Sequence, residues 1–183
     1  MFDNVSQGLF TTGATGYLII VPVLRSLAIL FMVISTYKLL KARQDRFILV
    51  TMAAGIKIQS FNDMLGAKFP IIRIMPNTPV AVGEGMILYS LCKAITECEE
   101  NEFLKVLEFS GKLDKLDEEL IDAGCVVSGC GPAFVYMFLE SIAKAGNEFG
   151  LPKEKAIEYA AQTLVGAAKL VEMSGKTPET LRQ

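Results

Sequence analysis

Short apolar runs alternate with a segment of helical spacing in the part of the chain that follows residue 46. Residues 47–51 (FILVT) and 71–75 (IIRIM) are apolar runs of the kind typical of strands covered on both faces. Between them, residues 56–65 carry apolar side chains at helical spacing, and Gly66 follows as the expected C-terminal cap. The pattern predicts two parallel strands joined through a helix by a right-handed crossover.

After a further strand predicted at residues 86–90, the apolar spacing changes to that of a helix, and the second half of the chain is predicted to be helical. The helix signals include proline in a first turn, glycine after a last turn, and a threonine cap before proline. The expected helices cover residues 99–109, 117–122, 132–149 and the stretch from Pro152 to Ser174, with a last one beginning at Thr177-Pro178. The pattern predicts an α/β N-terminal part with half of a doubly wound sheet, residues 1–91, followed by an all-helical C-terminal domain, residues 92–183.

Residues 17–37 are almost continuously apolar and long enough to cross a bilayer. Pro22 and Arg25 interrupt the run, and an arginine near the middle of a membrane segment costs about 2.5–3.5 kcal/mol on insertion scales. We therefore favour two short buried elements separated by a break. A membrane anchor is the alternative for this segment.

Composition narrows the function classes. With 183 residues, 51% of them hydrophobic, and 18 basic against 20 acidic side chains, the chain is neither a disordered polar tail nor a basic nucleic-acid-binding surface. The absence of histidine excludes histidine-based triads, zinc sites and proton shuttles. The four cysteines form no CxxC pair, so we expect reduced thiols in a cytoplasmic protein and no metal site.

Two turns are candidate ligand-binding sites. Residues 75–79 (MPNTP) follow the carboxyl end of a predicted parallel strand, where open α/β sheets bind their ligands. Residues 128–132 (SGCGP) lead into a predicted helix N-terminus, where free N–H groups favour an anion such as a carboxylate. A rigid polar turn and a flexible connector are the respective alternatives. A third segment, Gly13 to Gly16, lacks the further glycine of a phosphate-binding turn, and a plain glycine turn is the favoured interpretation.

The order and spacing of several motifs resemble those of the pyrroline-5-carboxylate reductase family over roughly residues 47–183. The residues that carry the resemblance are AAGI at 53–56, RIMPNTP at 73–79, GEG at 83–85, DA at 122–123, SGCGPAF at 128–134, Glu140, AG at 145–146, GLP at 150–152, AQT at 161–163 and GAAK at 166–169.

The resemblance implies a Rossmann domain that binds NADPH or NADH and a helical domain through which subunits interlock as dimers. It implies hydride transfer to the C=N bond of 1-pyrroline-5-carboxylate, a small-molecule substrate, to give L-proline. Such a reaction is the cofactor's own chemistry, so the lack of histidine is no obstacle. The residues that it assigns to the nicotinamide end of the cofactor pocket are Ala53, Ala54, Met75, Pro76, Asn77 and Thr78.

Two departures from the family pattern lower the expected activity. The first 46 residues contain Gly13 and Gly16 but no G-x-G-x-x-G turn, and the sequence stops near Leu181, before the family's substrate-carboxylate loop. The resemblance therefore assigns no catalytic residue. The alternative function is a non-catalytic remnant that keeps the dimerising helices of the family.

Overall fold

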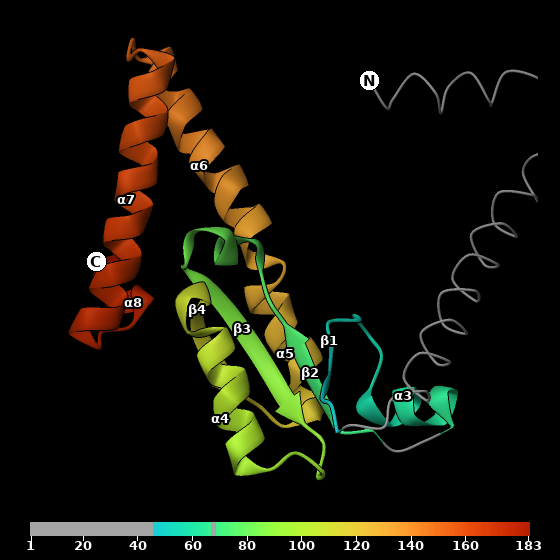
Figure 1. The fold of residues 1–183 in the computed structure, drawn as a ribbon. Helices are drawn as coiled ribbons and strands as arrows, with labels where there is room; N and C mark the ends of the chain where they lie inside the picture. The colour runs from blue at the N-terminus through green and yellow to red at the C-terminus, as the bar shows by residue number, and fades with distance from the viewer. Residues whose placement is uncertain (1–45, 67–68) are drawn as a thin grey trace, which may run out of the picture. The chain divides into compact units, whose positions relative to one another are not determined.

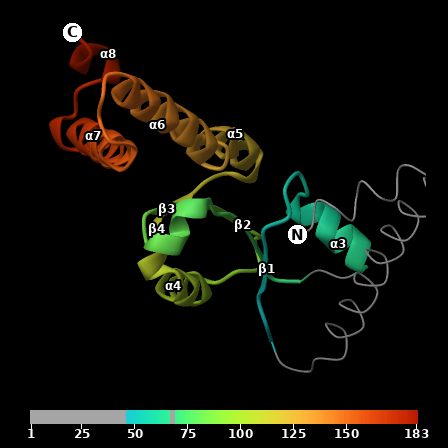
Figure 2. The same cartoon turned by 90° about the horizontal axis from the view of Figure 1, so that it is seen from above.

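The computed structural model of the protein describes residues 46–66 and 69–183 (Figures 1 and 2). The candidate glycine turn at Gly13 to Gly16 and the apolar segment 17–37 lie outside the described residues. The compact unit that begins at Ile48 runs to the end of the sequence and contains both candidate turns.

A four-stranded mixed sheet forms the first part of this unit (Figure 1). Its strands are β1 (Leu49–Thr51), β2 (Ile71–Met75), β3 (Gly85–Leu91) and β4 (Gly111–Lys115), hydrogen-bonded in that order. β1 and β2 are parallel, β3 runs antiparallel to β2, and β4 is parallel to β3. The strand–helix–strand prediction is confirmed, because α3 (Ile58–Leu65) joins β1 to β2 and ends at Gly66 with a φ of 59°.

The two faces of the sheet are covered by different helices (Figure 2). Ile72 and Ile74 of β2 pack with Ile87 and Tyr89 of β3 against Phe103 of α4 (Glu97–Val106). On the other face, Met75 and Leu88 pack against Ile121 of α5 (Glu118–Ser128). Side chains alternate between the two faces along a strand, so residues 72 and 74 of β2 face α4 and residue 75 faces α5.

The prediction that the second half is entirely helical is wrong at β4. The helix expected at residues 99–109 ends at Val106, and a short 3-10 helix, η2 (Glu108–Ser110), leads into the strand. The sequence of β4, GKLDK, has one large apolar side chain, so its pattern gives little strand signal. Pairing with β3 decides the conformation instead, as tertiary context often does for strands. A domain boundary between residues 91 and 92 stays a prediction, and β4 extends the sheet beyond it.

The remaining helices follow the predicted order. They are α5, α6 (Gly131–Glu148), α7 (Lys153–Ser174) and the short α8 (Pro178–Leu181), which begins at the Thr177 cap as predicted. α6 and α7 form a hairpin whose contact is made by the buried side chains of Ala143, Ala156 and Ala160 (Figure 1). Small side chains allow the two helix backbones to approach closely.

Large apolar side chains remain exposed along the hairpin. A soluble monomer rarely leaves so many of them uncovered on neighbouring turns. They include Phe134, Tyr136, Met137, Phe138, Phe149, Tyr159, Leu170 and Met173.

Candidate functional site

The predicted cofactor segments leave the same edge of the sheet. β1 and β2 are parallel, with Thr51 opposite Arg73, so the turn that holds Ala53 and Ala54 and the loop 75–78 both begin where their strands end. The backbone N–H of Ala53 donates to Thr51 Oγ1 over 3.3 Å, which fixes the start of the first turn. The carboxyl edge of parallel strands is where α/β sheets present ligand-binding loops.

Asn77 holds the loop 75–78 in place with its side-chain amide. Its Oδ1 accepts from the backbone N–H of Met86 at 2.9 Å, and its Nδ2 donates to the backbone carbonyl of Ser128 at 3.0 Å. The loop then continues into a 3-10 helix, η1 (Thr78–Val82), with Pro79 in its first turn. The Asn77 side chain thus joins β3 to the end of α5, and the two candidate turns predicted from sequence meet at this residue.

The segment 128–131, which we call the glycine turn, connects α5 to α6. The carbonyl of Cys125 accepts hydrogen bonds from Gly129 N at 2.8 Å and Cys130 N at 3.1 Å. α6 begins immediately afterwards, with Pro132 in its first turn, no acidic side chain there and no side-chain hydrogen bond from Cys130. Pro132 has no N–H, and the N–H of Ala133 donates to the carbonyl of Cys130 at 3.2 Å, so the anion site expected at this helix start stays a prediction.

Arg73 carries a charge that sequence reasoning did not assign to any role. Its side chain is fully buried in β2, with Nη2 donating to Asp122 Oδ1 at 2.6 Å and Nη1 lying 3.6 Å from Glu118 Oε1. Glu118 Oε1 also accepts from Ile58 N, at the start of α3, at 2.6 Å. The signal available in the sequence was a lone arginine in an apolar strand, because a buried cation requires acidic partners.

The six predicted cofactor residues differ in exposure. Ala54 and Thr78 are exposed, whereas Ala53, Pro76 and Asn77 are half-buried. The side chain of Met75 is buried against Leu88 and Ile121, so it supports the loop from the core side. The structure brings the loop 75–78 to the glycine turn, and the assignment of these residues to a cofactor stays a prediction.

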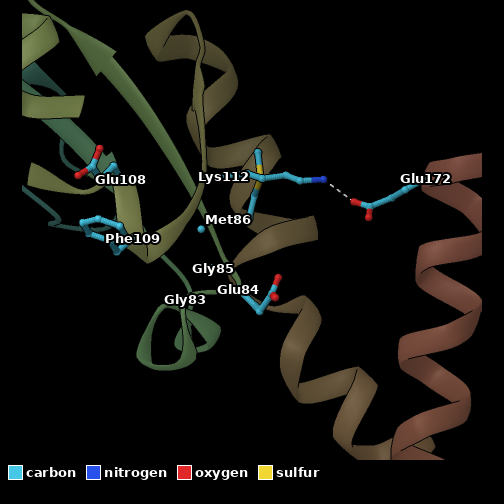
Figure 3. A pocket seen from close by; sticks show the side chains of 9 residues that line it. Gly83, Glu84, Gly85, Met86, Glu108, Phe109, Lys112 and Glu172 are labelled. Atoms are coloured by element: carbon cyan, nitrogen blue, oxygen red, sulfur yellow. Dashed lines mark hydrogen bonds and ion pairs between the residues drawn. The ribbon is translucent and has the colours of Figure 1, made fainter. Parts of the chain in front are cut away.

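A separate pocket of about 610 Å3 lies beside the turn Gly83-Glu84-Gly85 (Figure 3). Phe109 and the exposed ion pair between Lys112 and Glu172 also line it. Its lining includes none of the six predicted cofactor residues. Within residues 46–66 and 69–183, no group of three acidic or cysteine side chains is placed to hold a metal ion.

Known proteins resemble the chain over both the sheet and the helices. It is 40% identical to a pyrroline-5-carboxylate reductase of Pisum sativum over 135 residues, which cover 74% of this chain and 49% of that protein. It is 41% identical to pyrroline-5-carboxylate reductase 3 of Danio rerio, covering 74% and 47% of the two chains. The chain thus spans about half the length of the curated relatives it matches.

Among solved structures, a Plasmodium falciparum pyrroline carboxylate reductase with NADP bound superposes with a TM-score of 0.70 at 31% identity. The match covers 74% of this chain and 54% of that one. A 1-pyrroline-5-carboxylate reductase from Streptococcus pyogenes also gives a TM-score of 0.70, at 27% identity, covering 74% and 52%.

The helical part matches a family model of its own. Residues 118–183 fit the model described as pyrroline-5-carboxylate reductase dimerisation. In the described part of the chain, residues 118–148 are also long and apolar enough to cross a membrane, which alone is weak evidence for one. These residues lie within the part of the chain that matches the dimerisation model.

Proposed function

Because the chain belongs to the pyrroline-5-carboxylate reductase family over the residues it shares with these relatives, we propose that it takes part in the NAD(P)H-dependent reduction of 1-pyrroline-5-carboxylate to L-proline. The observation that carries the proposal is the hydrogen bond from Asn77 to Ser128, which joins the two motif-bearing turns at the carboxyl edge of the sheet. When bound, NADPH or NADH supplies the hydride that adds to the C=N carbon.

Residues of this chain would bind and orient the cofactor and the substrate. Ala53 and Ala54 are small, and Ala54 and Thr78 are exposed, so the edge of the sheet offers accessible backbone and a hydroxyl to the nicotinamide end of the cofactor. Asn77 contributes the shape of the loop, because both ends of its amide are already hydrogen-bonded within the protein. We assign the substrate's carboxylate to the glycine turn, because this turn meets the loop 75–78 at Asn77.

We further propose that two copies of the chain associate through the helices. Burial of the exposed aromatic and aliphatic side chains of α6 and α7 supplies the driving force. The alternative function, a non-catalytic dimerising remnant, keeps this association and lacks cofactor binding. Cofactor binding therefore separates the two functions.

The experiment that tests the reductase follows the loss of nicotinamide absorbance when the purified protein is mixed with 1-pyrroline-5-carboxylate and NADPH, and then with NADH. We expect a rate that saturates with both cofactor and substrate. Folded protein that gives no rate and binds no cofactor would support the dimerising remnant instead.

A substitution at Ala54 tests where the cofactor binds. Ala54→Leu places a bulky side chain at the exposed turn, and we expect it to raise the KM for the cofactor about tenfold, or about 1.4 kcal/mol of binding. Ala94→Leu is the matched control, because Ala94 is an exposed turn residue after β3. β3 runs antiparallel to β2, so this turn lies at the opposite edge of the sheet. An equal effect of the two substitutions would contradict the assignment of Ala54.

A further inference from the structure

Helix α5 is attached to the segment 73–77 at both of its ends. At its start, Glu118 and Asp122 face the buried guanidinium of Arg73. At its end, the carbonyl of Ser128 accepts from Asn77. Arg73 and Asn77 belong to one short segment of β2 and its loop, so a single stretch of backbone holds the helix at two points.

The spacing of the two attachments matches the geometry of the elements. At about 1.5 Å per residue, a helix rises about 15 Å from Glu118 to Ser128 and about 9 Å from Asp122 to Ser128. From Arg73 to Asn77 an extended chain advances about 13 Å, at about 3.3 Å per residue. The helix and the strand therefore run in the same direction over nearly the same length, and a shift of α5 by one turn would break both attachments.

We propose that Arg73 and Asn77 are positioning residues, which fix the register of α5 against β2 and thereby hold the glycine turn 128–131 beside the loop 75–78. The functional part of this role rests on the proposed function, which assigns the two turns to substrate and cofactor. The two attachments of α5 are features of the fold and do not depend on that assignment.

The charge on Arg73 makes its attachment specific. Its Nε and Nη1 have no acceptor within hydrogen-bond distance in the described part of the chain, so the buried cation depends on the carboxylates of Glu118 and Asp122. An uncharged helix face at this position would leave the guanidinium unpaired. Glu118 extends the connection to Ile58 N, so the start of α3, which follows the Ala53-Ala54 turn, is held by the same network.

The test is amide hydrogen exchange on the intact chain. Asn77→Asp keeps an acceptor for Met86 N and loses the donor to Ser128, and we expect the amides of residues 128–131 to exchange about tenfold faster. Exchange in α4 should stay unchanged, because α4 lies on the other face of the sheet. A role in overall stability alone would speed exchange in both regions equally.

Asn147→Asp is the matched control. Asn147 also donates from Nδ2 to a backbone carbonyl, that of Leu151 at 2.8 Å, but at the far end of α6. We expect faster exchange at residues 147–151 and none of the effect at the glycine turn. Equal acceleration of the glycine turn by both substitutions, or none by Asn77→Asp, would overturn the role of Asn77.

Arg73 is tested by Arg73→Met and Arg73→Lys. Arg73→Met should speed exchange at the start of α5 and of α3 as well as at the glycine turn, and Arg73→Lys, which keeps the charge, should restore much of the protection. If Arg73→Met leaves the glycine turn protected, α5 is not positioned by Arg73. Because exchange needs no catalysis, a wild-type protein without reductase activity would refute the proposed function and leave this test decisive.

Discussion

Tyr89 donates its phenolic hydrogen bond to Glu100 Oε1 over 2.8 Å, which joins strand β3 to helix α4. Burial of the ring and the neighbouring carboxylate of Glu100 raise the pKa of Tyr89 to about 12. Lys115 binds the other oxygen of Glu100 at 2.9 Å, so the three side chains connect the helix to two strands.

The raised pKa of Tyr89 predicts a loss of stability in alkali. The folded protein holds the phenolic proton more tightly than the unfolded chain, so this contribution is complete below pH 10 and decreases as the pH rises toward 12. We expect Tyr89→Phe to flatten the pH dependence of the free energy of unfolding between about pH 10 and 12, measured by urea denaturation. A profile as steep as that of the wild type would contradict the assignment.

The lowered pKa of Glu100 predicts a loss of folding stability in acid. Burial alone would raise the pKa of this carboxyl, but the hydrogen bonds from Lys115 and Tyr89 outweigh it and lower the pKa below 4.5. The stabilisation is therefore present above about pH 4.5 and is lost as the pH falls. Glu100→Gln should unfold more readily than the wild type at pH 7 and differ less from it at pH 3, by thermal denaturation. Glu97→Gln, on an exposed side chain of the same helix, serves as the control.

The close approach of Gly111 and Gly85 predicts a strict requirement for glycine. Gly111 has a φ of 123°, and a Cβ there would lie 2.1 Å from the carbonyl oxygen of Gly85. We expect Gly111→Ala to lower the free energy of unfolding by about 3 kcal/mol or more, since β3 and β4 would have to separate. Gly131→Ala is the control, because nothing lies within 4 Å of its added Cβ. Similar unfolding midpoints for the two variants would refute the requirement.

The exposed apolar side chains of α6 predict an interface between subunits. Phe138 is 57% exposed and lies within the residues that match the dimerisation family. Phe138→Glu should place an unpaired charge in the interface and shift the protein toward the monomer at micromolar concentration, as measured by light scattering after size exclusion. Val106→Glu changes an exposed apolar residue of α4, outside that match, and should leave the mass unchanged.

Much of the sheet could be predicted because apolar patterning and burial coincide there. All five residues of β2 are buried, and the predicted run at residues 71–75 has the same bounds. β4 was missed because pairing with β3 rather than its own composition makes it a strand. The meeting of the loop 75–78 with the glycine turn depends on one side chain, Asn77, whose two hydrogen-bond partners lie 9 and 51 residues away along the sequence.

The ion-pair partners of Arg73 could not be predicted from the sequence either. A sequence reveals an arginine among apolar residues, but its partners are 45 and 49 positions later and become neighbours only when α5 packs on the sheet. The surface of the hairpin was easier to anticipate. Apolar residues at helical spacing predict a buried face, and in the structure that face is exposed.

If two copies associate through α6 and α7 as proposed, the small alanine contact between these helices makes assembly part of folding. Ala143, Ala156 and Ala160 bury little apolar area, so burial of the outer side chains by a second copy would add most of the hairpin's stabilisation. Under the proposed association, we expect the stability of these helices to depend on protein concentration. In dilute solution the hairpin should be the first segment to open and to be cut by proteases, and raising the concentration should protect it while the sheet remains equally resistant.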